Sequence, residues 1–236
     1  IEKGCVASAI YNYPTFMNFF STSERLEIGD LPFITVDEKP SRLEALKYYR
    51  AIVSHFRLDV HQYEKVVNIR REEQEFVVET RQRGDRPTSY RANCVVVATG
   101  YFDNPNLMGI PGENLPKVHH YFKEPHPYFG QKAVVVGGKN FAVETALELE
   151  RVGAEVTMVY RRSAFRDGVK PWVKPVIESA IDKGRIRMYW NANLTEITAN
   201  TVKIDQNGKQ FELENDIVFA LTGYHADCSI LERLGV

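Results

Sequence analysis

The spacing of apolar residues divides the chain into predicted helices and strands. Residues 41–56 carry an imperfect apolar stripe at helical spacing. Ser41 precedes this stripe and Glu44 follows three residues later, which is the spacing of a capping box at a helix N-terminus. The pattern therefore predicts a helix that begins directly after Ser41.

Three apolar stretches after this helix predict strands. They cover residues 58–69, 72–81 and 89–100, and a charged turn joins the first two. Two segments rich in proline and glycine follow at residues 103–116 and 122–131. Because proline and glycine interrupt regular structure, we interpret these two segments as a crossover between domains.

A second unit begins with an entirely apolar strand over residues 133–136. Proline suits the first position of a helix and glycine suits its end, so Pro171 and Gly184 predict a helix over residues 172–183. The apolar stretch at 217–223 closes the unit. Four short strands are predicted between this helix and this closing stretch, at residues 186–190, 193–198, 201–205 and 210–214.

The stretch from Val134 to Glu150 runs from an apolar strand through glycines into a helix, as in dinucleotide-binding βαβ units. Gly137 allows the tight turn, and Ala142 is small enough for close helix packing. Lys139 replaces the glycine that lets a pyrophosphate approach, but its ammonium could face a phosphate at the helix N-terminus. A simple βα turn is the alternative interpretation. The candidate binding residues are Gly137, Gly138, Lys139, Asn140, Phe141 and Ala142.

Arginines follow the second strand of this βαβ unit. The strand EVTMVY, residues 155–160, is followed by Arg161 and Arg162, with Arg166 just beyond. An acidic residue at this place would hydrogen-bond a ribose 2′-hydroxyl and indicate NAD. Arginine instead suits the 2′-phosphate of NADP, because a guanidinium binds phosphate through two parallel hydrogen bonds. The alternative is an ordinary solvated loop.

Two similar segments flank the nucleotide unit. Residues 95–101, VVVATGY, and residues 218–224, VFALTGY, both place an apolar strand before Thr-Gly-Tyr. They stand where the chain would leave a first domain and return to it. Glu2 then becomes the ribose-binding acid of that domain, with a glycine loop upstream of Ile1. Because the sequence opens like the end of a strand, we expect it to be an internal piece of a longer protein.

At this point the sequence resembles flavoproteins with two dinucleotide-binding domains. These include thioredoxin reductases, thioredoxin-reductase-like ferredoxin–NADP reductases and flavin monooxygenases. The chain looks most like the YpdA-type reductases, which are proposed to act on bacillithiol disulfide and bacilliredoxins. The resemblance covers essentially the whole chain. The segments that carry it are residues 10–34, 44–50, 109–124, 137–154 and 170–175.

The resemblance implies an α/β fold with two Rossmann-like dinucleotide-binding domains and a small antiparallel sheet. The FAD-binding domain would be interrupted by an inserted NADPH-binding domain. The implied boundaries are 1–121 for the FAD domain, 122–221 for the NADPH domain and 222–236 for the return to the FAD domain. The implied cofactors are therefore FAD and NADPH.

The resemblance also assigns FAD-binding positions. Glu2 and Lys3 would meet the adenosine ribose, and Lys65 and Val66 the adenine. The other implied FAD positions are Phe20, Ser21 and Thr22 near the flavin, and Thr99, Gly100 and Tyr101 in the FAD pocket. Thr222 and Gly223, in the second Thr-Gly-Tyr segment, are cofactor-binding candidates without an assigned cofactor. The family's first glycine loop, with a cysteine suspected of redox work, and its final flavin-binding segment fall outside this sequence. Phe141 departs from the smaller serine expected beside the pyrophosphate.

Three separated cysteines limit the route of the electrons. Cys5, Cys94 and Cys228 form no Cys-x-x-C pair. Residues 117–125, which correspond to the dithiol segment of thioredoxin reductases, contain no cysteine. We expect Cys94 to be a core residue and Cys5 to have a packing role. The flavin would then pass its electrons to a separate acceptor, and no catalytic residue is assigned.

The composition narrows the possible partners. The net charge of −1 implies no general affinity for nucleic acid. No apolar run reaches the about 18 residues that span a bilayer, and no metal-ligand spacing is present. The unpaired cysteines favour a reducing compartment, so we expect a cytoplasmic protein. The expected partner is a small disulfide or a bacilliredoxin, without nucleic acid or membrane, and we expect a homo-oligomer.

Three functions remain open from the sequence. The leading hypothesis is an NADPH-dependent flavoprotein disulfide reductase, with a flavin monooxygenase as a second enzyme and a non-catalytic NADP-binding redox sensor as a third possibility. His119 and His120 could be general acids, hinge histidines or part of a polar turn. Trp172 could cover the nicotinamide or pack beneath a helix.

Overall fold

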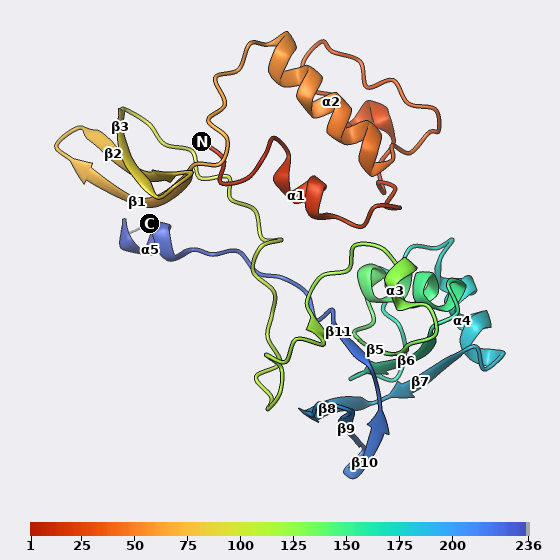
Figure 1. The fold of residues 1–236 in the computed structure, drawn as a ribbon. Coiled ribbons are helices and arrows are strands. Elements are labelled where there is room, and N and C mark those ends of the chain that lie inside the picture. The colour runs from red at the N-terminus through yellow and green to blue at the C-terminus, as the bar shows by residue number, and fades with distance from the viewer. Residues whose placement is uncertain (235–236) are drawn as a thin grey trace. The chain divides into compact units, whose positions relative to one another are not determined.

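The computed structural model describes residues 1–234, which divide into two compact units (Figure 1). Unit 1 contains Ile1–Asn104 and the chain from His225 onward, and unit 2 contains Pro105–Tyr224. Residues 105–121, which the sequence assigned to the first domain, thus pack within unit 2. Residues 235–236 of the predicted C-terminal return lie outside the described residues. This division into units does not by itself identify the cofactor that each unit binds.

The helical segments described in unit 1 are α1 (Ser8–Asn12), the 3-10 helix η1 (Ser23–Leu26), α2 (Arg42–His55) and α5 (Ser229–Arg233). Of these segments, only α2 was predicted from the sequence. Ser41 caps α2 through the predicted capping box, because its side chain accepts the Glu44 N–H and Glu44 accepts the Ser41 N–H. Tyr48 on α2 stacks on Phe33 with ring centroids 4.1 Å apart. The predicted helix is confirmed, and its buried face forms a small core of its own.

An antiparallel sheet completes unit 1. Its strands run in the order β1 (Lys65–Glu72), β2 (Glu75–Gln82) and β3 (Arg86–Ala92). The prediction that the third strand extends to Gly100 is wrong, since residues 93–100 pair with no strand among the described residues. Val96 is 88% exposed and Cys94 is exposed as well, so the expected core position of Cys94 is also wrong. An apolar pattern forms a strand only where a neighbouring strand supplies hydrogen bonds.

Unit 2 is organised around a parallel sheet. The strand order is β4-β11-β5-β6-β7. Its strands are β4 (Val118–His119), β5 (Lys132–Val136), β6 (Glu155–Tyr160), β7 (Ile186–Trp190) and β11 (Ile217–Ala220). Each neighbouring pair is parallel. Parallel sheets are covered on both faces, which explains why β5, β6 and β11 are almost entirely apolar.

The two faces of this sheet are covered by different elements (Figure 1). Helices α3 (Asn140–Arg151) and α4 (Lys174–Asp182) pack with Val135 and Phe219 in one core. Val134 and Val218 point to the other face, because neighbouring residues of a strand alternate between faces. This second face packs against an antiparallel sheet of β8 (Ala192–Ile197), β9 (Thr201–Gln206) and β10 (Lys209–Glu214).

The predicted elements of unit 2 are found with small shifts. Helix α4 begins at Lys174 with Pro175 in its first turn, so Pro171 is not its first residue. Gly184 adopts a φ of +70° directly after the helix, which confirms it as the stop. The 3-10 helix η2 (His126–Tyr128) is the one further helical turn of the crossover. The mixed α/β fold with a Rossmann-like parallel sheet is confirmed, with two antiparallel sheets rather than one.

Candidate functional site

The turn between β5 and α3 requires glycine at its first position. Gly137 has a φ of +142°, a region that side chains with a Cβ rarely adopt. A Cβ there would lie 2.6 Å from the Leu221 carbonyl oxygen and 2.8 Å from the Ala142 Cβ. The Gly137 N–H donates to the Val159 carbonyl at 3.1 Å. The predicted tight turn is therefore present and is packed from both sides.

The second glycine of the turn makes room for an aromatic ring. A Cβ on Gly138 would lie 2.5 Å from the ring of Tyr160. Tyr160 ends β6 and packs near Phe165 and Trp190. Sequence reasoning missed this role of Tyr160, because the contact joins two strands that only the fold brings together. The two glycines leave the backbone uncovered by Cβ atoms at the end of β5.

The N-terminus of α3 has no side-chain cap. Lys139 occupies the cap position with φ −102° and ψ 177°, an ordinary extended conformation. Its exposed side chain makes no hydrogen bond or ion pair with the residues that the structure describes. The first turn of α3 contains no acidic residue. The free N–H groups and the helix dipole therefore favour an anion at this place.

Asn140 ties the loop after β6 to the beginning of α3. Its Nδ2 donates to the Gly168 carbonyl at 2.9 Å, and its Oδ1 accepts the Lys170 N–H at 2.7 Å. The Lys170 ammonium lies 2.6 Å from the Glu144 carboxylate on the next turn of α3. The loop that carries the three arginines is thus held beside the glycine turn.

The three predicted arginines are exposed and uncompensated. The side chains of Arg161, Arg162 and Arg166 make no hydrogen bond or ion pair with any residue from 1 to 234. They follow the carboxyl end of β6, and the glycine turn follows the carboxyl end of β5. Neighbouring parallel strands place these ends at the same edge of the sheet. The structure therefore brings positive charge and an uncapped helix N-terminus together, which suits a phosphorylated ligand.

The second Thr-Gly-Tyr segment lies at the end of β11 in the same unit. The Thr222 hydroxyl donates to the Asn106 carbonyl, and the Asn106 N–H donates to the Gly223 carbonyl at 2.9 Å. Gly223 has a φ of +105°. The Phe141 ring lies 6.2 Å from the Tyr224 ring, measured between centroids. The segment is therefore fixed to the crossover and borders the first turn of α3.

His119 and His120 lie in and just after β4. Burial, reinforced by the neighbouring His120, lowers the pKa of His119, which favours its neutral form at neutral pH. The His120 Nε2 lies 4.0 Å from the buried Glu113 carboxylate, and its Nδ1 has no hydrogen-bond partner among the described residues. Glu113 accepts the N–H groups of Met108 and Gly109, both at 2.7 Å. These contacts favour a structural turn over an exposed general acid.

The predicted ribose acid of unit 1 lies against a neighbouring backbone segment. Glu2 donates its N–H to the His61 carbonyl at 2.8 Å and forms a parallel bridge with Gln62. Its Oε1 accepts the Gly4 N–H at 2.7 Å, and its Oε2 makes no hydrogen bond within the described chain. One carboxylate oxygen is thus free for a ligand. Lys65 and Val66 begin β1, shortly after this contact.

The other predicted FAD-binding residues of unit 1 are mostly exposed. Lys3 forms an ion pair of 2.8 Å with Asp103, which follows the first Thr-Gly-Tyr segment. Phe20 is 61% exposed, and the Lys39 ammonium lies 5.6 Å from its ring centroid. Ser21 is half-buried, and Thr22 occupies the N-cap position of η1 without a side-chain capping hydrogen bond. Thr99, Gly100 and Tyr101 are all exposed. These exposed side chains are accessible to a bound group.

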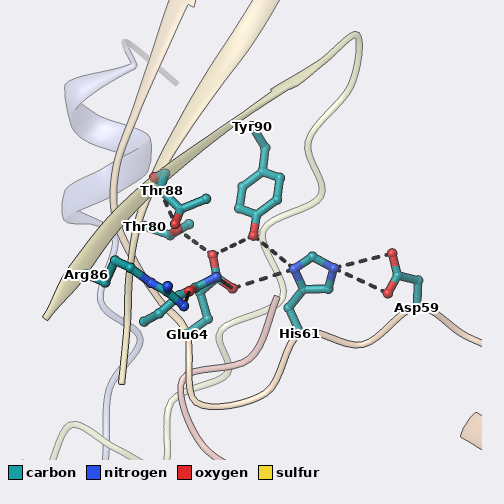
Figure 2. Close-up of polar contacts among 8 residues, drawn as sticks. Asp59, His61, Glu64, Thr80, Arg86, Thr88 and Tyr90 are labelled. Carbon is teal, nitrogen blue, oxygen red and sulfur yellow. Dashed lines mark hydrogen bonds and ion pairs between the residues drawn. The ribbon is translucent and has the colours of Figure 1, made fainter. Parts of the chain in front are cut away.

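Sequence reasoning also missed a buried polar cluster in unit 1, which Figure 2 shows around Glu64. Glu64 is 3% exposed. Its carboxylate accepts the hydroxyls of Thr80 at 2.5 Å and Tyr90 at 2.8 Å, and the Gln82 amide at 3.2 Å. His61 lies 3.5 Å from the same carboxylate. No sequence signal marks this cluster, because its members are spread over two strands, β2 and β3, and the segment that precedes β1.

The hydrogen bonds of this cluster fix its proton positions. The hydrogen bond from Thr80 is the main cause that lowers the pKa of Glu64, so the carboxyl group is ionised at neutral pH. The same carboxylate raises the pKa of Tyr90, which therefore stays a hydrogen-bond donor. An open pocket of about 350 Å³ borders the cluster and contains none of the predicted FAD-binding residues. Its lining residues are His61, Gln62, Tyr63, Glu64, Gln82, Arg83 and Arg86.

Comparison with known proteins identifies the family. The model described as "Pyridine nucleotide-disulphide oxidoreductase" matches residues 1–236. The chain belongs to this family. Bacilliredoxin reductase Bdr of Bacillus subtilis (strain 168) is 47% identical over 238 residues, which cover 100% of this chain and 72% of that protein. Members of the family use FAD and NADPH, which confirms the two predicted cofactors.

Solved structures of two such oxidoreductases are closely similar. Bacillithiol disulfide reductase Bdr (YpdA) from Bacillus cereus has a TM-score of 0.98 and 48% identity, covering 100% of this chain and 72% of that chain. The enzyme from Staphylococcus aureus has a TM-score of 0.95 and 43% identity, covering 99% and 71%. The predicted resemblance to YpdA-type reductases is thereby confirmed. The family assignment also confirms that the chain is an oxidoreductase.

Over residues 1–234, no helix is both long and apolar enough to cross a membrane. The same residues contain no group of three or more histidine, cysteine, aspartate or glutamate side chains arranged to hold a metal ion.

Proposed function

We propose that the chain passes electrons from NADPH through FAD to the disulfide of bacillithiol or of a bacilliredoxin. The observation that carries this proposal is the set of uncompensated arginines, Arg161, Arg162 and Arg166, beside the glycine turn. The similarity to the bacilliredoxin reductase of Bacillus subtilis supports the choice of acceptor. The overall reaction consumes NADPH, one proton and one disulfide, and yields NADP⁺ and two thiols.

The residues of unit 2 fit a phosphorylated dinucleotide. Gly137 and Gly138 allow the tight turn that a pyrophosphate approaches, since a Cβ would clash with Leu221 at the first position and with Tyr160 at the second. The uncapped N-terminus of α3 and the Lys139 ammonium offset its negative charge. Arg161, Arg162 and Arg166 bind the 2′-phosphate, which distinguishes NADPH from NADH. Asn140, Phe141 and Ala142 belong to the first turn of α3 and complete this site.

The residues of unit 1 fit the adenosine part of FAD. The free Oε2 of Glu2 is available to a ribose hydroxyl, and the Gly4 N–H holds the other oxygen in place. Lys65 and Val66 contact the adenine. The remaining proposed positions of unit 1 are Lys3, Phe20, Ser21, Thr22, Thr99, Gly100 and Tyr101, and Thr222 and Gly223 of unit 2 are further proposed cofactor-binding positions. These residues would hold and orient FAD, which when bound would supply the redox chemistry between NADPH and a disulfide.

The cysteines of the chain support a separate electron acceptor. Cys5, Cys94 and Cys228 are all free, and no pair of them forms a Cys-x-x-C. A relay through two neighbouring sulfurs is therefore not available in residues 1–234. We place the enzyme in the cytoplasm, where free thiols persist, and we propose that it works as a homo-oligomer.

Steady-state NADPH oxidation separates this function from its two alternatives. Purified protein is mixed with NADPH in air, with and without bacillithiol disulfide or an oxidised bacilliredoxin. We expect oxidation to depend on the disulfide and to release two thiols for each NADPH. Oxidation that instead requires an oxygen-accepting organic substrate would make the protein a monooxygenase. NADPH binding without turnover under any of these conditions would make it a sensor.

A further inference from the structure

The strand order of unit 2 fixes where a dinucleotide lies. Strand β5 stands at a switch point, with β6 and β7 on one side and β11 and β4 on the other. Ligands of open parallel sheets bind across the carboxyl ends of the strands at such a point. The arginines after β6 bind the 2′-phosphate on one side. The other half of the molecule, which carries the nicotinamide, then lies over the end of β11.

An aromatic group stands at this second position. Tyr224 follows β11, and the centroid of its ring lies 5.5 Å from that of Tyr121, with 21° between the two ring planes. The Phe141 ring on the first turn of α3 lies 6.2 Å from Tyr224. Tyr121 is 37% exposed. The three rings thus lead from the pyrophosphate turn to the end of β11.

The central ring of this group is held in place by the backbone. The Tyr224 hydroxyl donates to the His120 carbonyl at 3.0 Å. Tyr224 also forms an antiparallel bridge with Pro105, and the Asn106 N–H donates to the adjoining Gly223 carbonyl at 2.9 Å. A ring fixed in this way loses little freedom when a planar ligand stacks on the group, which favours binding.

We infer that Phe141, Tyr224 and Tyr121 form the platform that receives the nicotinamide ring of NADPH. The inference rests on the proposed function, because it takes the arginines as the 2′-phosphate site. Stacked aromatic rings attract planar rings, and tyrosine faces attract cations. The oxidised nicotinamide carries a positive charge and the reduced form does not. The platform therefore binds NADP⁺ more strongly than NADPH, because only the oxidised nicotinamide gains the cation–π attraction.

Two ligands separate the platform from the arginine site. NADP⁺ contains both halves of the dinucleotide, and 2′,5′-ADP contains the adenosine and both its phosphates but no nicotinamide. Calorimetric titration measures both ligands against wild type, Tyr224→Leu and Tyr121→Leu. Tyr224→Phe serves as the matched control, because it keeps the ring and removes only the hydroxyl that binds the His120 carbonyl.

We expect Tyr224→Leu to weaken NADP⁺ binding about fivefold to tenfold, the range of a lost aromatic stack, and to leave 2′,5′-ADP binding unchanged. Tyr121→Leu should give a smaller change of the same kind, and Tyr224→Phe, which keeps the ring but loses the hydroxyl that fixes it, should weaken NADP⁺ binding less than either leucine variant. Unchanged 2′,5′-ADP binding also shows that each variant is folded. The Michaelis constant for NADPH should rise less than the dissociation constant for NADP⁺.

Two results would overturn the inference while leaving the proposed function intact. Equal weakening of both ligands by Tyr224→Leu would mean that the tyrosine only supports the fold. Unchanged binding of NADP⁺ by both leucine variants would mean that the nicotinamide lies elsewhere. If wild-type protein fails to bind 2′,5′-ADP at all, the arginine site itself is wrong, and the proposed function and this inference fall together.

Discussion

Two charged regions of the molecule differ in how their charges are balanced. In unit 1, the Glu64 carboxylate is 3% exposed and accepts hydrogen bonds from Thr80, Tyr90 and Gln82. In unit 2, the side chains of Arg161 and Arg162 are exposed and make no hydrogen bond or ion pair with the described chain. A buried charge must be paired to be tolerated, whereas an exposed charge without a partner is free to bind a ligand. A charged side chain alone therefore does not indicate a binding site. Unpaired positive charge beside a glycine turn and an uncapped helix N-terminus does.

The hydrogen-bonded cluster around Glu64 has a structural role, which the exposed arginines do not have. Glu64 N–H donates to the Glu2 carbonyl at 3.0 Å, and Tyr63 N–H donates to the Gly4 carbonyl at 2.9 Å. The carboxylate network thus holds the segment that aligns the predicted ribose acid. Its lowered pKa keeps Glu64 an acceptor, and the raised pKa of Tyr90 keeps the tyrosine a donor. Neither group is suited to exchange protons with a substrate near neutral pH.

The largest expected effect comes from removing the uncompensated charges. The double variant Arg161→Ala/Arg162→Ala loses two charged hydrogen-bond donors to the 2′-phosphate. We expect the Michaelis constant for NADPH to rise about 100-fold or more, and that for NADH to change less than about threefold. Initial rates with each coenzyme measure both constants.

A control arginine shows whether any loss of charge has this effect. Arg187 lies on β7 in the same unit, 3.9 Å from Glu155, and its side chain is 52% exposed. Arg187→Ala should leave both Michaelis constants near the wild-type values. A parallel rise of the NADPH and NADH constants in the double variant would show that the arginines do not read the 2′-phosphate.

The next prediction concerns the turn beside the arginines, where we infer that the backbone of position 137 requires glycine. Gly137→Ala places a Cβ 2.6 Å from the Leu221 carbonyl oxygen at a φ of +142°. We expect the free energy of unfolding to fall by about 2–4 kcal/mol. Gly168→Ala is the matched control, because no atom lies within 4 Å of its Cβ. Urea denaturation of both variants decides the point, and equal stability of the two would remove the packing argument for the turn.

A smaller effect is expected in the hydrogen-bonded cluster around Glu64. Glu64→Gln removes the charge that Thr80 and Tyr90 donate to, and we expect the Tm at pH 7 to fall by about 5 °C. The folded-state pKa of Glu64 is lowered, so its stabilising effect is present above the unfolded pKa of about 4.3 and is lost as the pH falls through the folded value. The difference in Tm between wild type and variant should therefore shrink below that pH.

Glu73 provides the control for this variant. It is exposed at the turn between β1 and β2 and makes no hydrogen bond or ion pair with other described residues. Glu73→Gln should leave the Tm unchanged at every pH. A difference in Tm for Glu64→Gln that stays constant from pH 7 to pH 3.5 would show that the amide disrupts packing rather than charge balance.

Unit 2 was predictable because its signals are local. Parallel strands buried on both faces appear as continuous apolar runs, so β5, β6 and β11 could be predicted directly. The glycine turn is also local, since Gly137 follows β5 in the sequence. Its exact packing was not predictable, because Leu221 and Tyr160 reach the turn only in the folded chain.

Contacts between distant residues could not be predicted. Asn140 holds partners 28 and 30 residues away, and Glu64 accepts hydrogen bonds from residues 16 and 26 positions away. The two similar segments illustrate the same limit. Residues 217–220 pair with β4 and β5 and are buried, whereas Val96 in the first segment is 88% exposed. The same apolar pattern had two outcomes because only one segment has neighbouring strands in the described structure.

The smallest expected effect concerns Lys139. Its side chain is exposed and unpaired like those of the arginines, but it lies outside the loop that carries them. Its extended backbone, with φ −102° and ψ 177°, is open to any residue, so glycine would relieve no strain there. Lys139→Gly removes the whole side chain, including the ammonium that we propose to face the pyrophosphate. Because the side chain is exposed, we expect NADPH binding to weaken about twofold to fivefold, and more at low ionic strength, where screening is least. Titration of NADPH at two salt concentrations measures this, with Lys139→Met as the control that keeps the chain length. Tighter binding by the glycine variant at both concentrations would show that the lysine obstructs the pyrophosphate, and the uncompensated region would then consist of the arginines alone.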